Sequence, residues 1–505
     1  MIKSKQGSGD TPAYRGLAYL VFEDLELERF GNRVPQIEVE VIRSVGDLEH
    51  KLRAISVIPG STEHGLDPGA VRKKSDKKTV EVNRHTLFGE TDWQASIDEL
   101  FSVAPNLRHV SLVVSWFGDD LRAGECKIRP GLVERSGSDE TKTWRVAGRD
   151  RSSIDVREVS RHNDDAAYGG TPTDESVVAA IEDLNKRGVL VTLNPFLLMD
   201  IATTNNLPSP YNGDPSQPAY PWRGRITCHP ARGEMSTVDR TADARSQLET
   251  FVGTTNSTAF LIDGTNVTAD GSVGWDYRTF VLHYAHLAAA AGGVDTFIIG
   301  SELRGLTQVR DDADQFAFVE ALIALASDVR AILGPHTKIT YGADWTEYFG
   351  FQPNDGSGDV YYHLDPLWAS AAIDAVGIDM YAPLSDWREG DALHADNPDG
   401  FAHHADVEAM KAQVEGGEGF DWYYASEEDR ENRLRTAITD GAYNKPWVFR
   451  FKDLTNWWAN AHFDRRSGVE LTNASAWQPK SKPVFLLEAG CTALRGGAVQ
   501  PNVFP

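Results

Sequence analysis

Cysteine is scarce in this sequence, which has only Cys126, Cys228 and Cys491 in 505 residues and no CxxC pair. Such a set argues against a disulfide framework and against a cysteine-based zinc site. The sequence also lacks the glycine spacing of a phosphate-binding loop, and nothing else in it indicates a metal or a cofactor. No N-terminal apolar stretch resembles a signal peptide, and no run of about 18 apolar residues could span a membrane. We therefore expect synthesis in the cytoplasm, without a membrane span.

Basic residues are outnumbered, with 50 Lys and Arg against 74 Asp and Glu, which gives a formal net charge of −24. A surface this acidic repels phosphate backbones, so we expect no nucleic-acid partner. The one short basic run, Arg72-Lys73-Lys74 with Lys77-Lys78, lies in a polar stretch and is interpreted as a solvated loop.

Short apolar runs rich in β-branched residues alternate with helical patterns from about residue 50 onward. Near-continuous apolar strands separated by helices indicate a parallel sheet that is covered on both faces. Seven such units favour an α/β fold of the (β/α)8 TIM type over a doubly wound sheet. The predicted strands are Leu52–Ile58, Val110–Trp116, Val189–Phe196, Thr296–Glu302, Lys338–Trp345, Ala375–Tyr381 and Pro483–Glu488, and the predicted helices are Asp92–Ala104, Asp174–Arg187, Tyr277–Ala291 and Gln315–Leu333.

An eighth strand is missing from this pattern, because the residues after Glu488 are few, Gly-containing and end in Pro. We therefore expect the fragment to stop before the barrel closes. The sequence predicts an N-terminal β segment at residues 1–48, with strands Leu17–Phe22 and Gln36–Arg43, and a barrel at residues 49–505. Long βα-loop insertions at about 117–173, 198–275 and 382–482 leave the C-terminal ends of strands, so we expect them to stand over the active face.

Two glutamates end apolar strands, Glu302 on the fourth and Glu488 on the seventh. Burying an unpaired carboxylate at such a place is expensive, so the pair indicates chemistry more than packing. Hydrolysis of a glycosidic bond uses two carboxyl groups, one as proton donor and one as nucleophile or base. Glu302 and Glu488 are the predicted catalytic pair. The alternative is that Glu302 forms a structural salt bridge with Arg304 or another cation.

Other polar or aromatic side chains lie at the ends of the predicted strands, where a barrel holds its substrate. Asp119, beside Asp120, could bind a cation or a sugar hydroxyl, and it could equally cap a turn. The predicted substrate-binding residues are Trp116, Asp119, Asn194, Asp344, Trp345, Asp379 and Tyr381.

The positions of the two glutamates resemble those in the large clan of retaining barrel glycosidases. In that clan the acid/base ends strand four and the nucleophile ends strand seven, which implies these roles for Glu302 and Glu488. Tyr381 matches the tyrosine that often hydrogen-bonds the nucleophile. Ser301 departs from the pattern, because the acid/base of that clan usually follows an Asn.

A closer resemblance covers nearly the whole chain. Segments such as AYGGTPTDESVVAAI, QPAYPWRGRITC, RTFVLHYAHLAAAAGGVDTFIIGSELRGLT and LDPLWASAAIDAVGIDMYAPLSDWR look like the TIM-barrel-like domain of large gene-transfer-agent and phage tail proteins. The opening PAYRGLAYLVFEDLELERFGNRVPQIEVEVIR is similar to the tail-hub segment that precedes this barrel. The resemblance implies a longer parent chain and a glycoside hydrolase-like barrel in a baseplate or host-specificity component of the virion.

Two functions follow from this resemblance. In the first, an enzyme in a phage-like tail particle cleaves bacterial surface polysaccharide or peptidoglycan by a retaining mechanism. In the second, the barrel is an inactive structural or glycan-binding tail module. Other tail and baseplate proteins are expected partners in both.

Overall fold

The computed structural model describes residues 25–35, 41–42, 44, 46–58, 61–75, 78–135, 140–271, 273–391 and 398–503. The chain divides into two compact units, Met1–Arg43 and Ser44–Pro505. In the first unit the described element is the short 3-10 helix η1 (Leu27–Phe30). The predicted strand Leu17–Phe22 lies outside the described residues, as does Gln36–Arg43 except for Val41 and Ile42, which are in no strand.

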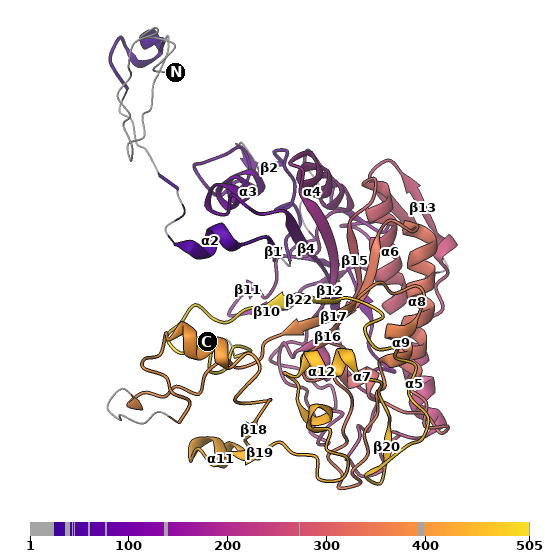
Figure 1. The fold of residues 1–505 in the computed structure, drawn as a ribbon. Coiled ribbons are helices and arrows are strands. Elements are labelled where there is room, and N and C mark those ends of the chain that lie inside the picture. The colour runs from indigo at the N-terminus through magenta and orange to yellow at the C-terminus, as the bar shows by residue number, and fades with distance from the viewer. Residues whose placement is uncertain are drawn as a thin grey trace. The chain divides into compact units, whose positions relative to one another are not determined.

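The second unit is built on one sheet whose main strands run parallel (Figure 1). Each of the seven predicted apolar runs is one strand, and their order in the sheet is their order in the chain. The prediction of a seven-stranded, nearly closed barrel of the TIM type is therefore confirmed. These strands are β1 (Ala54–Val57), β4 (His109–Gly118), β12 (Leu190–Met199), β15 (Thr296–Ser301), β16 (Lys338–Asp344), β17 (Val376–Met380) and β22 (Val484–Ala489).

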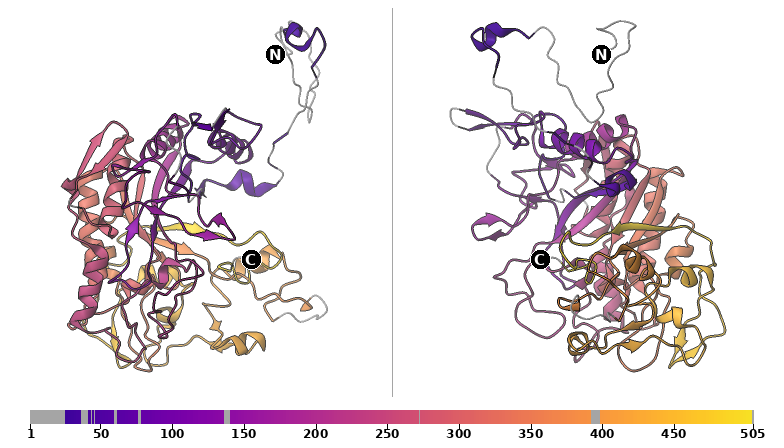
Figure 2. Two further views of the ribbon diagram at one scale, coloured as in Figure 1. Left: turned by 180° about the vertical axis from the view of Figure 1, so that it is seen from behind. Right: turned by 60° about the vertical axis from the view of Figure 1, so that its left-hand side comes forward.

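Helices cover the outer face of this sheet, and Figures 1 and 2 show α5, α6 and α8 stacked beside its middle strands. Three of the long helices begin at residues that cap the first turn, because Thr91, Thr173 and Asp276 each accept a hydrogen bond from the backbone N–H three residues on. The long helices are α3 (Asp92–Val103), α4 (Asp174–Lys186), α5 (Ala242–Val252), α6 (Tyr277–Ala290) and α8 (Ala317–Leu333).

The direction of each side chain follows from the alternation along a strand. In β4, Val110, Leu112, Val114 and Trp116 pack into the core shared with the helices. In β17, Val376 and Ile378 do the same, which leaves Gly377 and Asp379 on the inner face. By the same alternation, Asn194 of β12 and Asp344 of β16 lie between residues that pack into this core, and so they lie on the inner face of the barrel.

The remaining elements are short and lie mainly in the insertions. Arg72, Lys73 and Lys74 of the basic run lie in β2 and Lys78 lies in β3, which pairs with it as an antiparallel hairpin, so the interpretation of these four residues as a loop is wrong. Arg72 pairs with Glu81 across the hairpin. The short strands are β2 (Arg72–Ser75), β3 (Lys78–Glu81), β5 (Ile128–Arg129), β6 (Gly131–Leu132), β7 (Arg145–Val146), β8 (Arg149–Asp150), β9 (Arg157–Glu158), β10 (Arg161–His162), β11 (Asp165–Ala166), β13 (Phe260–Asp263), β14 (Asn266–Ala269), β18 (Trp422–Tyr423), β19 (Thr436–Ala437), β20 (Arg465–Arg466) and β21 (Val469–Glu470).

The short helices are α2 (Asp47–Lys51), η2 (Arg223–Arg225), η3 (Ser257–Ala259), α7 (Arg304–Thr307), α9 (Asp365–Ala369), α10 (Val407–Ala412), α11 (Glu427–Glu431), η5 (Pro446–Phe449) and α12 (Leu454–Ala459). None of the described helices combines the length and the apolar composition needed to cross a bilayer.

The last insertion is fastened to the barrel by a buried polar contact. His462 Nδ1 lies 2.9 Å from Asp365 Oδ2 of α9, and both side chains are buried. The imidazole ring is stacked between Tyr362 and Trp477. Buried polar groups need such partners, so this contact fixes the place where the insertion returns to the sheet.

Candidate active site

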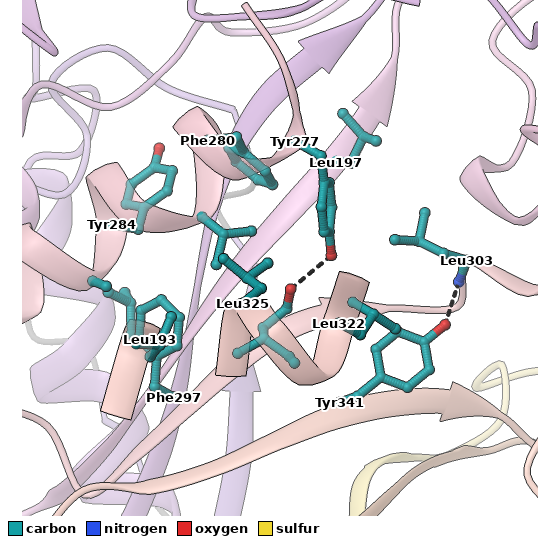
Figure 3. Close-up of a cluster of buried hydrophobic side chains, with 14 of the residues drawn as sticks. Leu193, Leu197, Tyr277, Phe280, Tyr284, Phe297, Leu303, Leu322, Leu325 and Tyr341 are labelled. Atoms are coloured by element: carbon teal, nitrogen blue, oxygen red, sulfur yellow. Dashed lines mark hydrogen bonds between the residues drawn. The ribbon is translucent and has the colours of Figure 1, made fainter. Parts of the chain in front are cut away.

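A distortion at the end of β15 presents Glu302. The register between β15 and β16 shifts between Ile298 and Ser301, and Glu302 adopts a left-handed backbone conformation with φ 54°. That conformation is uncommon for a residue with a side chain and is often found at functional sites. The same distorted segment contains Gly300, where a Cβ would lie 1.9 Å from the hydroxyl of Tyr277, which donates to Ile299 O (Figure 3).

One oxygen of Glu302 is held by two residues from the second insertion. Trp222 donates its Nε1–H to Glu302 Oε2 at 2.7 Å, and Arg223 Nη2 lies 3.0 Å from the same oxygen. Arg223 also donates to the carbonyl and the hydroxyl of Ser301, both at 2.8 Å. Both Arg223 and Glu302 are buried. Glu302 therefore has a cationic partner, as in the structural alternative, although that partner is Arg223 rather than Arg304.

Glu488 of β22 lies beside Asp379 of β17, its partner in the strand register. Burial raises the pKa of Asp379 well above its ordinary value, and the charges of Glu488 and Glu302 add to this. Burial also raises the pKa of Glu488, against a hydrogen bond of 2.8 Å from the Tyr381 hydroxyl to Glu488 Oε2. Ser301 donates to Asp379 Oδ2 at 2.6 Å. The ends of three strands thus bring Glu302, Asp379 and Glu488 into one carboxyl cluster, in which each charge acts on its neighbours.

A further carboxyl group, that of Glu347, is buried behind Glu302. Its pKa is raised to about 8 by burial, in part offset by a hydrogen bond from Thr307. The Tyr341 hydroxyl donates to Glu347 and accepts from the backbone N–H of Leu303 at 2.8 Å (Figure 3). Glu347 thereby supports both ends of the segment from Leu303 to Thr307, which directly follows Glu302.

The structure brings some of the predicted substrate-binding residues to this cluster. Asp344 is buried on the inner face of β16, and burial together with the charge of Glu302 raises its pKa. Asn194 is also buried on an inner face, and its Oδ1 has no hydrogen-bond partner among the described residues. Tyr381 and Asp379 belong to the cluster itself.

Three other predicted residues have different surroundings. Trp116 is fully buried against Trp275 and Phe280. Its position in β4 turns the side chain outward, towards the helices. The expectation that Trp116 binds substrate is therefore wrong. Asp119 accepts from Lys127 N at 2.8 Å and lies 3.6 Å from Arg157. Trp345 packs edge-on against Phe451 of the last insertion, with ring centroids 4.6 Å apart.

One further cluster among the described residues has metal-ligating side chains, namely Glu63, His64 and Glu140. Arg151 bonds both glutamates, with its Nη2 2.9 Å from Glu140 Oε1. A guanidinium in that position already supplies the positive charge that a metal ion would bring. The candidate active site itself contains carboxyl, hydroxyl, indole and guanidinium groups.

Comparison with protein families bears directly on this region. Residues 275–505 match the family model of the GTA TIM-barrel-like domain. The resemblance predicted from the sequence is thereby confirmed for these residues. The matched residues include β15, β16, β17 and β22, and so they contain all three carboxyl groups of the cluster.

No curated protein matches the chain. Solved structures that resemble it include two of GH113 β-1,4-mannanase, one of them a complex, with 14% and 15% identity and TM-scores of 0.25 and 0.26. They cover 55% and 57% of this chain. A third is the GH113 β-mannanase AaManA from Alicyclobacillus acidocaldarius in complex with ManMIm, with 13% identity, a TM-score of 0.26 and 61% of this chain covered. The chain spans 53%, 56% and 57% of these three proteins.

Sequence reasoning did not single out Trp222 and Arg223 as site residues. They lie about 80 residues before Glu302, in an insertion without a strong periodic pattern. The available signal was the segment QPAYPWRGRITC, which carries the family resemblance and contains both residues.

Proposed function

We propose that this chain is a glycoside hydrolase-like component of a gene-transfer-agent or phage-like tail particle that cleaves a bacterial envelope glycan with retention of configuration. The proposal rests mainly on one observation. The fourth and seventh strands of a parallel barrel carry Glu302 and Glu488 into one carboxyl cluster, in which Tyr381 donates a hydrogen bond to Glu488.

In this mechanism Glu488 Oε1 attacks the anomeric carbon while Glu302 passes a proton to the departing glycosidic oxygen. A covalent glycosyl ester forms on Glu488, and the alcohol leaves with the proton. Glu302 then takes a proton from water, whose oxygen displaces Glu488 from the same carbon. Trp222 and Arg223 occupy Oε2 of Glu302, and Oε1 makes no hydrogen bond among the described residues, so Oε1 is the atom that exchanges the proton.

The test is hydrolysis of peptidoglycan and capsule fragments by the whole chain, measured as new reducing ends. Glu302→Gln and Glu488→Gln should each lower the rate by about 100-fold or more, since acid–base catalysis alone contributes 10²–10⁴-fold. Glu408→Gln, on the exposed surface of α10, is the matched control and should retain full activity. Full activity in both site variants would refute the assignment. So would a crystal structure with the two carboxyl groups more than about 9 Å apart.

The second candidate is a barrel that holds a glycan without cutting it. The contact of Arg223 with Glu302 favours it, because a guanidinium 3.0 Å from a buried carboxylate oxygen is also the geometry of a structural ion pair. Ser301 in place of the usual Asn points the same way. Binding of envelope polysaccharide with no product after long incubation would support this candidate.

The assignment to a tail particle rests on the GTA TIM-barrel-like domain at residues 275–505. Its expected partners are other tail and baseplate proteins, with assembly after synthesis in the bacterial cytoplasm. Mass spectrometry of purified particles should detect the chain in a fixed ratio to the tail-tube protein. Its absence from particles that contain a complete tail would contradict the assignment.

A further inference from the structure

A pocket of ≈300 Å³ lies beside the candidate active site. Its lining contains three arginines, Arg225, Arg232 and Arg304, and we call it the arginine pocket. The aromatic rings of Trp222 and Tyr211 form part of its wall, and none of its lining residues is acidic. This composition is unusual in a chain whose formal net charge is −24.

The three arginines differ from those elsewhere in the described chain, which are typically ion-paired, as Arg245 is with Asp311 and Arg465 with Asp440. Among the described residues no carboxylate oxygen lies within 4.0 Å of the guanidinium groups of the arginine pocket. The Nε–H of Arg304 is buried and has no hydrogen-bond partner. A buried donor without an acceptor costs free energy, so a ligand oxygen within reach of this group would be stabilised.

Two of the guanidinium groups are oriented by aromatic rings rather than by carboxylates. Arg225 lies over Tyr211 at 5.2 Å, and Arg232 lies over Phe351 at 4.2 Å. The Tyr211 hydroxyl also donates to Arg225 O at 2.7 Å. Cation–π contacts restrict a guanidinium without neutralising it, so its positive charge remains available to a ligand.

The arginine pocket shares a wall with the carboxyl cluster. Trp222 lines the pocket and donates its Nε1–H to Glu302. Arg304 begins α7, the turn that directly follows Glu302 and Leu303. A sugar chain bound across Glu302 would therefore place a neighbouring unit in the pocket.

We propose that the arginine pocket binds a negatively charged sugar unit, one that bears a carboxylate or a phosphate, next to the bond at Glu302. This inference rests on the proposed function for its place in a glycan site, and it specifies the substrate class as an anionic glycan. Guanidinium groups match the planar, two-oxygen geometry of carboxylates and phosphates. The volume lies at the lower end of the range for small-molecule pockets, which suits a single sugar unit.

The experiment measures binding by calorimetry with the whole chain and four probes. These are tetragalacturonate, mannose 6-phosphate, neutral mannotetraose and inorganic phosphate. We expect at least one of the two anionic sugars to bind about tenfold or more tightly than mannotetraose, and its affinity to fall between about 50 mM and about 500 mM salt. The anionic sugar that binds identifies whether the natural group is a carboxylate or a phosphate.

Substitutions localise the binding. Arg304→Gln should weaken binding of the anionic sugar about tenfold, the size expected for one charge-assisted hydrogen bond. Arg232→Gln, on the exposed side of the pocket, should weaken it in the same direction and is not expected to disturb folding. Arg145→Gln is the matched control, because Arg145 is exposed in β7 and does not line the pocket.

Several outcomes would overturn the proposal. These are equal affinity for charged and neutral sugars, an equal loss in Arg145→Gln and Arg304→Gln, or binding of inorganic phosphate as tight as that of the sugar phosphate. Glu488→Gln separates this inference from the proposed function, because it removes the nucleophile and leaves the arginine pocket intact. Anionic sugar binding without hydrolysis in any variant would contradict the proposed activity and still support the pocket.

Discussion

Glu347→Gln tests whether the carboxyl group behind Glu302 is uncharged at neutral pH. Glu347 is fully buried in a network of Thr307, Tyr341 and the backbone N–H of Asp344. Its pKa is about 8 in the folded chain, against an ordinary 4.5, because burial penalises the charged form. A glutamine fits the network of the neutral acid, since its amide can donate to Thr307 while its oxygen accepts from Tyr341 and Asp344.

The magnitude follows from the two pKa values. A raised pKa in the folded state stabilises the protein fully below about pH 4.5, and this stability is lost as the pH rises towards 8. At 1.36 kcal/mol per pH unit, the whole loss is about 5 kcal/mol. Between pH 5 and pH 8 the loss is about 3.5 kcal/mol, after allowing for partial titration at both ends.

Denaturant unfolding of both proteins at pH 5 and pH 8 measures this loss directly. The free energy of unfolding of Glu347→Gln, relative to wild type, should rise by about 3.5 kcal/mol between the two pH values. Other titrating groups are common to both proteins and cancel in the comparison. Glu408→Gln, at an exposed site, should show no such change relative to wild type. A relative stability of Glu347→Gln that stays constant within about 0.5 kcal/mol would refute the reasoning.

Three further predictions concern the site and its support. Tyr381→Phe removes the hydrogen bond that lowers the pKa of Glu488, so kcat/KM should fall about tenfold and the acidic limb of its pH profile should move to higher pH; an unchanged profile would contradict this. Gly300→Ala places a Cβ 1.9 Å from the Tyr277 hydroxyl and should lower the free energy of unfolding, measured in thermal melts, by about 2 kcal/mol or more. The double variant with Tyr277→Phe should recover part of this loss, and no recovery would assign the loss to another cause. His462→Ala leaves the buried Asp365 without its ring partner and should cost about 3–5 kcal/mol, whereas His85→Ala, at an exposed site, should cost less than about 1 kcal/mol.

The barrel was predictable because parallel strands buried on both faces are continuous apolar runs. A segment such as Val110–Trp116 has too few polar residues for a surface strand and too many β-branched residues for a helix. Each strand then begins and ends within a few residues of its run. The two-residue strands of the insertions were not predictable, because a pair such as β7 and β8 carries no periodicity.

The site was predictable where it depends on strand ends and unpredictable where it depends on contacts across the chain. Asp379 and Tyr381, which lie in the carboxyl cluster, could be singled out because they end a predicted barrel strand. Trp116 was misplaced because the end of β4 is buried on both faces, so the sequence there does not show which side chains turn outward. Trp222 and Arg223 were missed because a salt bridge to Glu302 follows from the path of a loop, which local sequence does not encode.

The position of β22 at the edge of the sheet has a consequence for motion. Among the described residues, β22 pairs with β17 alone, whereas β12 pairs with strands on both sides. The local opening that exposes amide hydrogens to solvent costs less free energy in a strand with one neighbour than in a central strand. The backbone of Val484–Ala489 should therefore exchange its amide hydrogens faster than that of Leu190–Met199. Since Glu488 is part of that backbone, any strand that pairs with β22 would slow its exchange and hold this carboxyl group more rigidly.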